Sequence, residues 1–545
     1  MKLVTVAEMI SIEREANAHG LTYETMMENA GHGLAEIILE EYCDLKDGGV
    51  LGLVGSGNNG GDTLVALSYL AEKGWQASAY IVRPRPADDA LMQRLSRSGG
   101  VIHNIEDDKN RSGLIKIIRD HAILVDGVLG TGIRLPLNPP LAEILDIIRI
   151  EIQNEPQPPI VVAVDCPSGI DCDSGETSPE CIPANLTVTM AAIKSGLMKF
   201  PAFSLLGDLR VISIGLPEKG EESETWKAVN CTVPDFESVR QYMPIRPLDA
   251  HKGTFGTLMV VAGSIKYTGA ALLAGQAAFR SGAGLVTLAI PTPLHAPLAG
   301  QFPEATWLPL PHKGGFIASE ASNILQSNLE RATSLLLGPG FGLEGTTGEF
   351  LSRILNIDFE LNSKLGAKKS NASTSSHYKS NLPPLVIDAD GLKLLVKIPG
   401  WWSYLPEQTV LTPHPGEMSV LTGLSTQEIQ TDRLEIARDF SRKWGHILVL
   451  KGAFTVISAP DSQAAVIPVA TPALARAGTG DVLSGLIAGL RAQGVDGFQA
   501  AVAGAWIHAQ AGLLAAETIG NSASVLAGDV CDAVVDVISV LYNPN

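Results

Sequence analysis

The stretch VLGLVGSGNNGGDTLVALSYLAEK, residues 50–73, decides the fold of the first part of the chain. It passes from a short apolar segment, Val50–Val54, through a glycine-rich turn, Gly55–Asp62, into the amphipathic segment Asp62–Lys73. A short run that is apolar at every position predicts a strand buried on both faces of a parallel sheet. A strand, a glycine-rich turn and a helix in this order predict a Rossmann-like α/β domain.

The same alternation extends outward from this stretch. Further buried strands are predicted at Ser78–Val82, Ala122–Asp126, Ile160–Asp165 and Leu209–Ile214. Helical patterns are found at Val6–Ala18, Tyr23–Tyr42 and Leu141–Ile152. We therefore predict that residues 1–216 form one α/β domain.

A charged, proline-containing segment, 217–249, follows and is predicted to be a linker and the edge of the next domain. From Gly256 the alternation of strands and helices restarts, and the chain ends in helical patterns at Thr479–Arg491 and Gly497–Glu517. We predict a second α/β domain over residues 250–545. Within it, residues 362–384 are rich in Ser, Asn and Lys, which predicts a mobile surface insertion.

Composition excludes several classes of function. Lys and Arg number 40 against 58 Asp and Glu, which gives a formal net charge of −18 and argues against a nucleic-acid surface. The six cysteines form no CxxC pair and no zinc-ligand spacing, so we expect reduced thiols in a cytoplasmic protein. The uncharged stretch Phe498–Ala516 contains Gln and His, and we expect a buried helix there rather than a membrane span.

Three predicted loops in the first domain bring polar side chains to one edge of the sheet. Asp126 and Asp165 each end a strand, and the third loop is GSGNNGGD itself. The carboxyl ends of parallel strands open onto one crevice, where two carboxylates with Asn and Ser oxygens could hold a hard cation or transfer protons. The alternatives are a tight turn with Asn in left-handed geometry and aspartates that cap helices.

The combination of GSGNNGGD, DGVLGTG (Asp126–Gly132) and VDCPSGID (Val164–Asp171) resembles the YjeF amino-terminal domain, the NAD(P)H-hydrate epimerase. The resemblance implies that Asp165 contacts the reacting nicotinamide and serves as acid or base. It implies a potassium ion held by Asn59, Asp126 and Ser168. Thr63 departs from the family, which usually has Gly there, and this leaves the tightness of the helix start open. The implied substrate contacts are Asn58, Asn59, Gly60, Gly61, Asp62, Gly130, Thr131, Gly132, Ile133, Arg134, Leu135, Pro136 and Asp165.

The second domain carries its own set of motifs: HKGTFG (His251–Gly256), GSIKYTGAALLAG (Gly263–Gly275), TPHPGE (Thr412–Glu417), KGAFTVI (Lys451–Ile457) and AGTGDVLSGLIAGL (Ala477–Leu490). The last of them opens a helix whose free N–H groups can hold a phosphate. Asp481 is then placed to act as a base, with a helix cap as the alternative. His414 could be a turn residue, and Lys451 could be either a phosphate ligand or a solvated strand end.

Together these motifs resemble the ribokinase-like superfamily, and within it the YjeF carboxy-terminal domain, the NAD(P)H-hydrate dehydratase. The resemblance implies that Ala270, Gly340, His414 and Asp481 contact the hydrated nicotinamide nucleotide. It also implies Mg²⁺ bound with ADP. DADGLK at Asp388–Lys393 departs from the family pattern, which weakens any role for Lys393. The implied nucleotide contacts are Lys451, Gly452, Ala453, Phe454, Thr455 and Gly480.

Both resemblances imply one bifunctional enzyme that repairs hydrated nicotinamide cofactors. The first domain would interconvert the R and S hydrates of NADH and NADPH, and the second would dehydrate the S form with ADP, releasing AMP and phosphate. We expect a homo-oligomer with no nucleic-acid or membrane partner. Two alternatives remain at this point: a ribokinase-like small-molecule kinase fused to a ligand-binding domain, and a first domain that serves only as an interaction module.

Overall fold

The computed structural model describes residues 1–86, 88–216, 223–357 and 382–543. The chain divides into two compact units, Met1–Cys231 and Thr232–Asn545. This division falls inside the segment 217–249, and the domain limits given above stay a prediction. The insertion expected at 362–384 lies outside the described residues, apart from its last three positions.

The first unit is built on a seven-stranded sheet whose neighbouring strands are all parallel. The chain runs from β2 outward to β3 and β4 and then crosses to β5 on the other side of β2. The point where the order reverses, between β2 and β5, is where α/β sheets of this kind bind ligands. In spatial order the strands are β4 (Val101–Asn104), β3 (Ala77–Ile81), β2 (Val50–Val54), β5 (Ile123–Gly127), β6 (Ile160–Val164), β7 (Leu186–Met190) and β9 (Asp208–Ile212).

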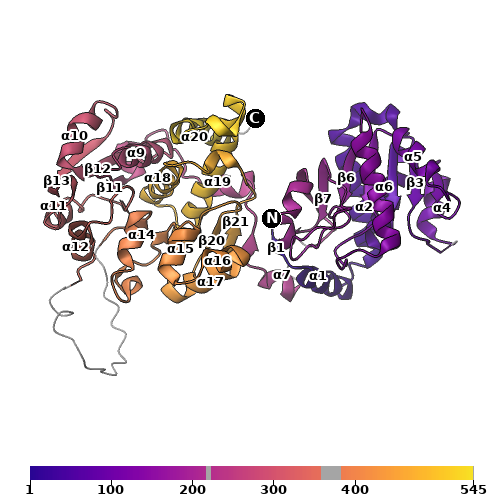
Figure 1. Ribbon diagram of the computed structural model, residues 1–545, viewed down its shortest axis with the longest axis horizontal. Coiled ribbons are helices and arrows are strands. Elements are labelled where there is room, and N and C mark those ends of the chain that lie inside the picture. The colour runs from indigo at the N-terminus through magenta and orange to yellow at the C-terminus, as the bar shows by residue number, and fades with distance from the viewer. Residues whose placement is uncertain (87, 217–222, 358–381, 544–545) are drawn as a thin grey trace, which may run out of the picture. The chain divides into compact units, whose positions relative to one another are not determined.

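Helices cover both faces of this sheet (Figure 1). On one face, α1 (Val6–Ala18), α2 (Tyr23–Glu41) and α3 (Asn58–Glu72) bury an apolar cluster against alternate residues of the strands. On the other face, α5 (Ser112–Arg119) and α6 (Pro139–Asn154) bury a second cluster against the remaining residues. The Rossmann-like α/β prediction is confirmed, because strands buried on both sides require this arrangement.

The start of α3 differs from the sequence prediction. The helix begins at Asn58, so Asn58–Asp62 form its first turn and not a loop, and neither asparagine is left-handed. Gly60 allows this early start, because a Cβ there would lie 2.1 Å from the carbonyl oxygen of Gly55. The alternative of a tight left-handed Asn turn is therefore wrong.

The second unit contains a ten-stranded sheet that is parallel from β13 to β19 and antiparallel at β20 and β21. Its order reverses between β11 and β16. The spatial order is β10 (Cys231–Thr232), β21 (Ala464–Val466), β20 (Val456–Ser458), β19 (Ile447–Leu450), β18 (Val410–Leu411), β17 (Leu385–Ile387), β16 (Ser334–Leu337), β11 (Thr257–Val261), β12 (Leu285–Pro291) and β13 (Thr306–Leu310).

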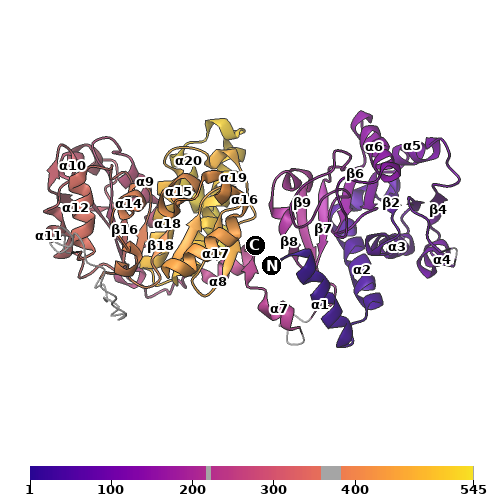
Figure 2. The ribbon, with the colours of Figure 1, turned by 60° about the horizontal axis from the view of Figure 1, so that its bottom comes forward.

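Figure 2 shows the helices α9 (Ala270–Arg280), α18 (Thr479–Ala492), α19 (Gly497–Ile519) and α20 (Ala527–Tyr542) in the second unit. A large cluster of buried apolar side chains joins them to the sheet. The helix α19 is buried along most of its length, as predicted. No helix in the described ranges is long and apolar enough to cross a membrane. All six cysteines are free, and all except Cys43 are buried.

Candidate functional site

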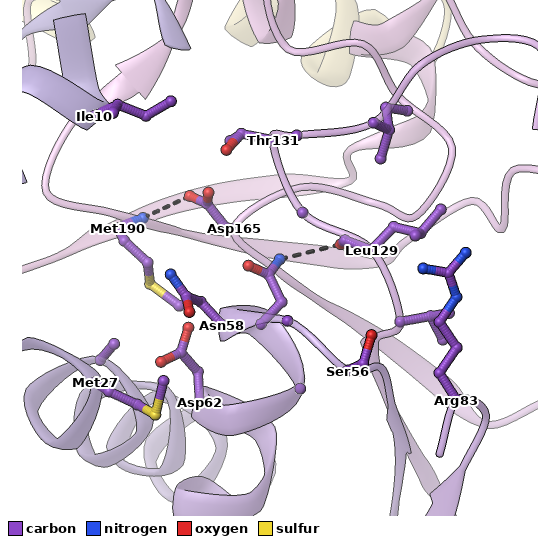
Figure 3. Close-up of a pocket in the computed structure, with 18 of the residues that line it drawn as sticks. Ile10, Met27, Ser56, Asn58, Asp62, Arg83, Leu129, Thr131, Asp165 and Met190 are labelled. Atoms are coloured by element: carbon purple, nitrogen blue, oxygen red, sulfur yellow. Dashed lines mark hydrogen bonds between the residues drawn. The ribbon is translucent and has the colours of Figure 1, made fainter. Parts of the chain in front are cut away.

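A cavity of about 960 Å³ opens at the carboxyl ends of β2, β5 and β6 (Figure 3). Polar residues from the segments that follow these three strands line it, although the segments are far apart in the sequence. This agrees with the prediction that the strand ends open onto one crevice. Gly61 and Leu135, which were expected to touch substrate, do not line it. The predicted residues that do line it are Asn58, Asn59, Gly60, Asp62, Gly130, Thr131, Gly132, Ile133, Arg134, Pro136 and Asp165.

Thr63, the departure noted in the sequence, fits tightly at the start of α3. Its hydroxyl donates to the carbonyl oxygen of Asn59 at 2.7 Å, and the side chain is fully buried. A Cβ on Gly127 would lie 1.9 Å from that hydroxyl, and one on Gly52 would lie 2.6 Å from the threonine methyl group. The two strand glycines therefore provide the space that Thr63 occupies.

We expect Gly127→Ala to destabilise the first unit by about 1–3 kcal/mol, the usual cost of overpacking a filled core. The added methyl group must displace Thr63 and, through its hydrogen bond, Asn59. Urea unfolding of the variant measures this loss, and Gly132→Ala is the matched control, because a Cβ at Gly132 meets open space. Equal stability of the two variants would contradict the packing argument.

Asp165 directly follows β6 and adopts a left-handed backbone with φ of 66°, which is unusual for an aspartate. Its Oδ1 accepts from the Thr189 hydroxyl at 2.8 Å and from the Met190 N–H at 3.1 Å. The ammonium group of Lys194 donates to the same oxygen and also contacts the Met190 carbonyl oxygen at 3.0 Å. Lys194 is 1% exposed, so Asp165 belongs to a buried ion pair and does not cap a helix.

Asp62 and Glu13 add two further carboxyl groups to the same cavity. Burial raises the pKa of Asp62 well above its usual range, and the charges of Asp165 and Glu13 add to this. Burial also raises the pKa of Glu13, although the charge of Lys194 opposes the shift. Figure 3 shows Asp62, from α3, and Asp165, from the end of β6, at the same end of the cavity.

Two of the three residues expected to hold potassium, Asp126 and Ser168, contact each other, and Asn59 joins them through Leu129, which donates its N–H to the Ser168 hydroxyl at 2.9 Å. The Asp126 carboxylate accepts from the Ser168 hydroxyl at 2.6 Å and from the Ser168 N–H at 2.8 Å. The Asn59 amide nitrogen donates to the carbonyl oxygens of Leu129 at 3.1 Å and Val164 at 2.5 Å, which fixes its oxygen as a free acceptor. Asp126 is fully buried, its pKa is raised by that burial, and it forms no ion pair within the described residues.

This donor set fits a monovalent hard cation. It supplies one carboxylate, one hydroxyl and one amide oxygen, and a buried carboxylate without a lysine or arginine partner gains stability from a bound cation. No cluster of three or more His, Cys, Asp or Glu able to hold a metal is present in the described part of the chain.

In the second unit, Asp481 lies in the first turn of α18, whose N-cap is Gly478. The helix has no side-chain cap, so the alternative that Asp481 caps it is wrong. Burial raises the pKa of Asp481 to about 7, and the charge of Asp388 contributes, while Lys451 opposes the shift. A carboxylate with such a pKa exchanges protons readily near neutral pH.

Lys451 lies close to Asp481 and is not a solvated strand end. Its ammonium group contacts Asp388 at 2.6 Å and Glu417 at 3.7 Å, and its side chain is 16% exposed. Burial lowers its pKa, but the charges of Asp388 and Glu417 outweigh this and raise it. A Cβ added to Gly480 would lie 3.5 Å from this ammonium, so Lys451 faces the glycine-rich start of α18.

His414 lies at the end of a loop, directly before a helix, and its side chain is exposed to solvent. It is the N-cap of α15 (Pro415–Thr422), where its Nδ1 accepts from the N–H groups of Gly416 at 3.0 Å and Glu417 at 3.3 Å. Burial alone would raise the pKa of Glu417, but the hydrogen bond from His414 and the charge of Lys451 lower it to about 2. The side chain of His414 is 51% exposed, so it remains accessible to a ligand.

The predicted hydrate contacts Ala270 and Gly340 lie side by side at the reversal point of the second sheet. Gly340 has φ of 65°, and a Cβ there would lie 2.9 Å from the Cβ atoms of Ala270 and Tyr267. Gly452, in the predicted nucleotide loop, approaches the guanidinium of Arg433, which donates to the Leu450 carbonyl oxygen at 2.8 Å. Lys393 contacts Asp390 at 3.1 Å and Glu417 at 3.7 Å, so it neutralises carboxylates.

The sequence predicted no role for four residues of these sites: Glu13, Lys194, Asp390 and Arg433. Glu13 lies on an ordinary amphipathic helix, and Lys194 is a single lysine in a short strand, β8 (Ile193–Lys194). Their roles depend on tertiary neighbours from other loops. Asp390 stood inside the quoted DADGLK segment, and its hydrogen bond from the Gly342 N–H, 2.9 Å long, could not be read from it.

Comparison with known proteins adds independent observations. Residues 23–196 match the family described as YjeF-related protein N-terminus, and residues 258–534 match the family described as NAD(P)H-hydrate dehydratase. The bifunctional NAD(P)H-hydrate repair enzyme Nnr of Moorella thermoacetica is 34% identical over 98% of this chain and 96% of its own length. The enzyme of the same name from Coxiella burnetii is 32% identical over 98% of both chains.

Among solved structures, the ADP/ATP-dependent NAD(P)H-hydrate dehydratase of Bacillus subtilis, co-crystallised with ATP and Mg²⁺, is 27% identical with a TM-score of 0.46. It covers 58% of this chain and 100% of its own length. The two whole-length relatives include both units, and each family matches one unit. The chain therefore belongs to the family of bifunctional NAD(P)H-hydrate repair enzymes.

Proposed function

We propose that the first unit epimerises the R and S hydrates of NADH and NADPH and that the second dehydrates the S hydrate with ADP. The observation that carries the proposal is the presence of two separate acid–base sites, Asp165 with Lys194 after β6 and Asp481 with Lys451 at the start of α18. The whole-length similarity to bifunctional repair enzymes supports the pairing of these two activities.

In the dehydratase site, Asp481 is positioned to accept the proton of the substrate hydroxyl. The hydroxyl oxygen then takes the terminal phosphoryl group of ADP, and AMP leaves. Phosphate departs from the ring carbon with the electrons of the carbon–oxygen bond, the neighbouring carbon gives its proton to water, and the electrons of that carbon–hydrogen bond form the ring double bond. Phosphorylation turns a poor leaving group into a good one, and Lys451 with the N–H groups of α18 is suited to hold the phosphates.

Two cations are part of the proposal. Mg²⁺ bound to the nucleotide would neutralise phosphate charge, which proteins commonly arrange with few carboxylates of their own. K⁺ would be held by Asn59, Asp126 and Ser168 and would fix the loop after β5 against α3. Asn58 and the segment 130–136 would then surround the nicotinamide, with Asp165 facing the ring.

A single assay tests the function. Purified protein is incubated with a mixture of R and S hydrate and ADP, and the absorbance of reduced nicotinamide is followed. Complete conversion of both epimers supports two activities, whereas conversion that stops when the S form is consumed contradicts the epimerase. A stable phosphorylated alcohol, without return of the absorbance, would support the kinase alternative instead.

We expect dehydration to lose activity at acid pH. Asp481 must be ionised to accept a proton, and burial raises its pKa to about 7. The value of kcat/KM should therefore rise about tenfold per pH unit below pH 7 and level off above it. Initial rates with pure S hydrate at fixed ADP measure this profile.

The phosphate of ADP titrates in the same range, so the profile needs a control. The charge of Asp390 also raises the pKa of Asp481, and its removal in Asp390→Asn should move the limb to lower pH. If the acid side of the profile comes from titration of the ADP phosphate, it should not move in Asp390→Asn. That result would contradict the assignment to Asp481.

A further inference from the structure

The cavity of the first unit holds two carboxyl groups in opposite environments. On Asp165, one oxygen accepts from a hydroxyl, an N–H and the Lys194 ammonium, and such a set of donors requires the ionised carboxylate. Asp62 is 6% exposed, and its carboxyl makes no hydrogen bond or ion pair with the part of the chain that the structure describes. Little access to water and the lack of a partner favour the neutral form of such a carboxyl.

We propose that Asp62 is the proton donor and Asp165 the proton acceptor of the epimerisation, and that Lys194 is the positioning residue that keeps Asp165 ionised. The inference rests on the proposed epimerase function of this cavity. A pair of acids whose surroundings favour opposite protonation states is the arrangement expected of an acid and a base acting on one substrate.

The chemistry of the substrate calls for such a pair. Water adds to the ring double bond of a reduced nicotinamide at the carbon next to nitrogen, so the hydrate is a hemiaminal whose epimers differ at that carbon. Asp62 gives its proton to the hydroxyl as the carbon–oxygen bond breaks, water leaves, and the lone pair of the ring nitrogen forms an iminium ion. Water then adds to the opposite face and gives a proton to Asp165.

The cycle closes when the proton returns from Asp165 to Asp62 through water in the cavity, so no other reactant is consumed. Both carboxyls line the cavity, and they come from different elements, α3 and the loop after β6. This placement allows one group to serve the departing hydroxyl and the other to serve the entering water.

Other titratable groups face the same cavity and must be separated from Asp62 in any test. Glu13 is the main alternative proton donor, because its carboxyl also lines the cavity and burial also raises its pKa. Among the described residues these groups are Glu13 from α1, Tyr23 from α2, Arg83 after β3, Arg134 after β5, and Asp165, which is paired with Lys194 behind it.

The decisive variant is Asp62→Asn. Asparagine keeps the size and the neutral charge of a protonated aspartate and can still donate a hydrogen bond, but it cannot give up a proton. We expect epimerisation of the R hydrate to fall by about 10²–10⁴-fold, with thermal stability unchanged. Asp107→Asn, at an exposed position of the same unit, is the matched control.

Initial rates are measured by NMR exchange between the R and S signals, and ADP-dependent dehydration of pure S hydrate is measured on the same sample. Wild-type protein that does not epimerise would refute the proposed function itself. If the wild-type protein epimerises and the Asp62→Asn variant is just as active, the acid assignment alone is refuted. Loss of activity in Glu13→Gln but not in Asp62→Asn would transfer the role to Glu13 and overturn the proposal.

Lys194 is tested by the pH profile, which a merely structural role would not move. In Lys194→Met the acid limb of epimerisation should shift to higher pH, because the positive charge beside the Asp165 carboxylate is gone. Lys194→Arg keeps that charge and should restore the wild-type profile, and it serves as the test if the methionine variant does not fold. An unshifted limb in Lys194→Met, or a shifted limb in a folded Lys194→Arg protein, would overturn the positioning role.

Discussion

Replacing Asp481 with Asn is expected to lower the rate of dehydration by about 10²–10⁴-fold or more, while epimerisation continues at the wild-type rate. Asp481 is the carboxyl whose pKa is raised to about 7 at the start of α18, beside Lys451. Asparagine keeps its shape and removes its ability to accept a proton. Because the two units form separate compact bodies of the chain, the loss should stay within the second.

The control variant is Asp536→Asn, which removes an exposed carboxylate from α20 in the same unit. It should dehydrate S hydrate at the wild-type rate. ADP should raise the melting temperature of both variants, which shows that the nucleotide site is intact. If Asp481→Asn still dehydrates at near the wild-type rate, Asp481 is not the base, and another carboxylate of the cluster must accept the proton.

Much of this architecture follows from the sequence because its strands are continuous apolar runs. Val50–Val54 was predicted to the residue, and the strands ending near Asp126 and Asp165 were placed within one or two residues. Strands buried on both faces leave no polar residue to blur their limits. The ends of parallel strands meet at one edge, so the gathering of Asn59, Asp126 and Ser168 could also be predicted.

What could not be predicted depends on contacts between loops. Lys194 reaches Asp165 across 29 positions, and nothing in the local sequence distinguishes it from a surface lysine. The early start of α3 depends on the close approach of Gly60 to Gly55, a backbone contact that a pattern of residue types does not reveal. The strand β7, LTVTM, was missed because its threonines, Thr187 and Thr189, are polar residues buried by hydrogen bonds.

Asp126→Asn is expected to lower the affinity for potassium by at least about 10–100-fold, the loss seen when groups that support a metal ligand are removed. The concentration of potassium that gives half-maximal epimerisation should rise by the same factor. The Asp126 carboxylate is the single charge among the three proposed ligands, and it is fully buried without an ion pair in the described residues. Asparagine removes that charge and also turns an N–H group toward donors on Ser168. Epimerisation rates over a range of KCl, with choline as the replacement cation, measure the change.

The competing explanation is that Asp126 only joins two loops through Ser168, in which case its loss would lower stability by about 1–3 kcal/mol and spare the chemistry. Asp171→Asn separates the two explanations, because Asp171 accepts from the N–H groups of Asp173 and Ser174 in the same way but is not a proposed ligand. A bound ion stabilises only the folded state, so potassium should raise the melting temperature of wild-type protein and of Asp171→Asn, but not that of Asp126→Asn. Equal potassium dependence in all three proteins would leave Asp126 with the structural role alone, since a ligand cannot lose its charge without changing the affinity of the ion.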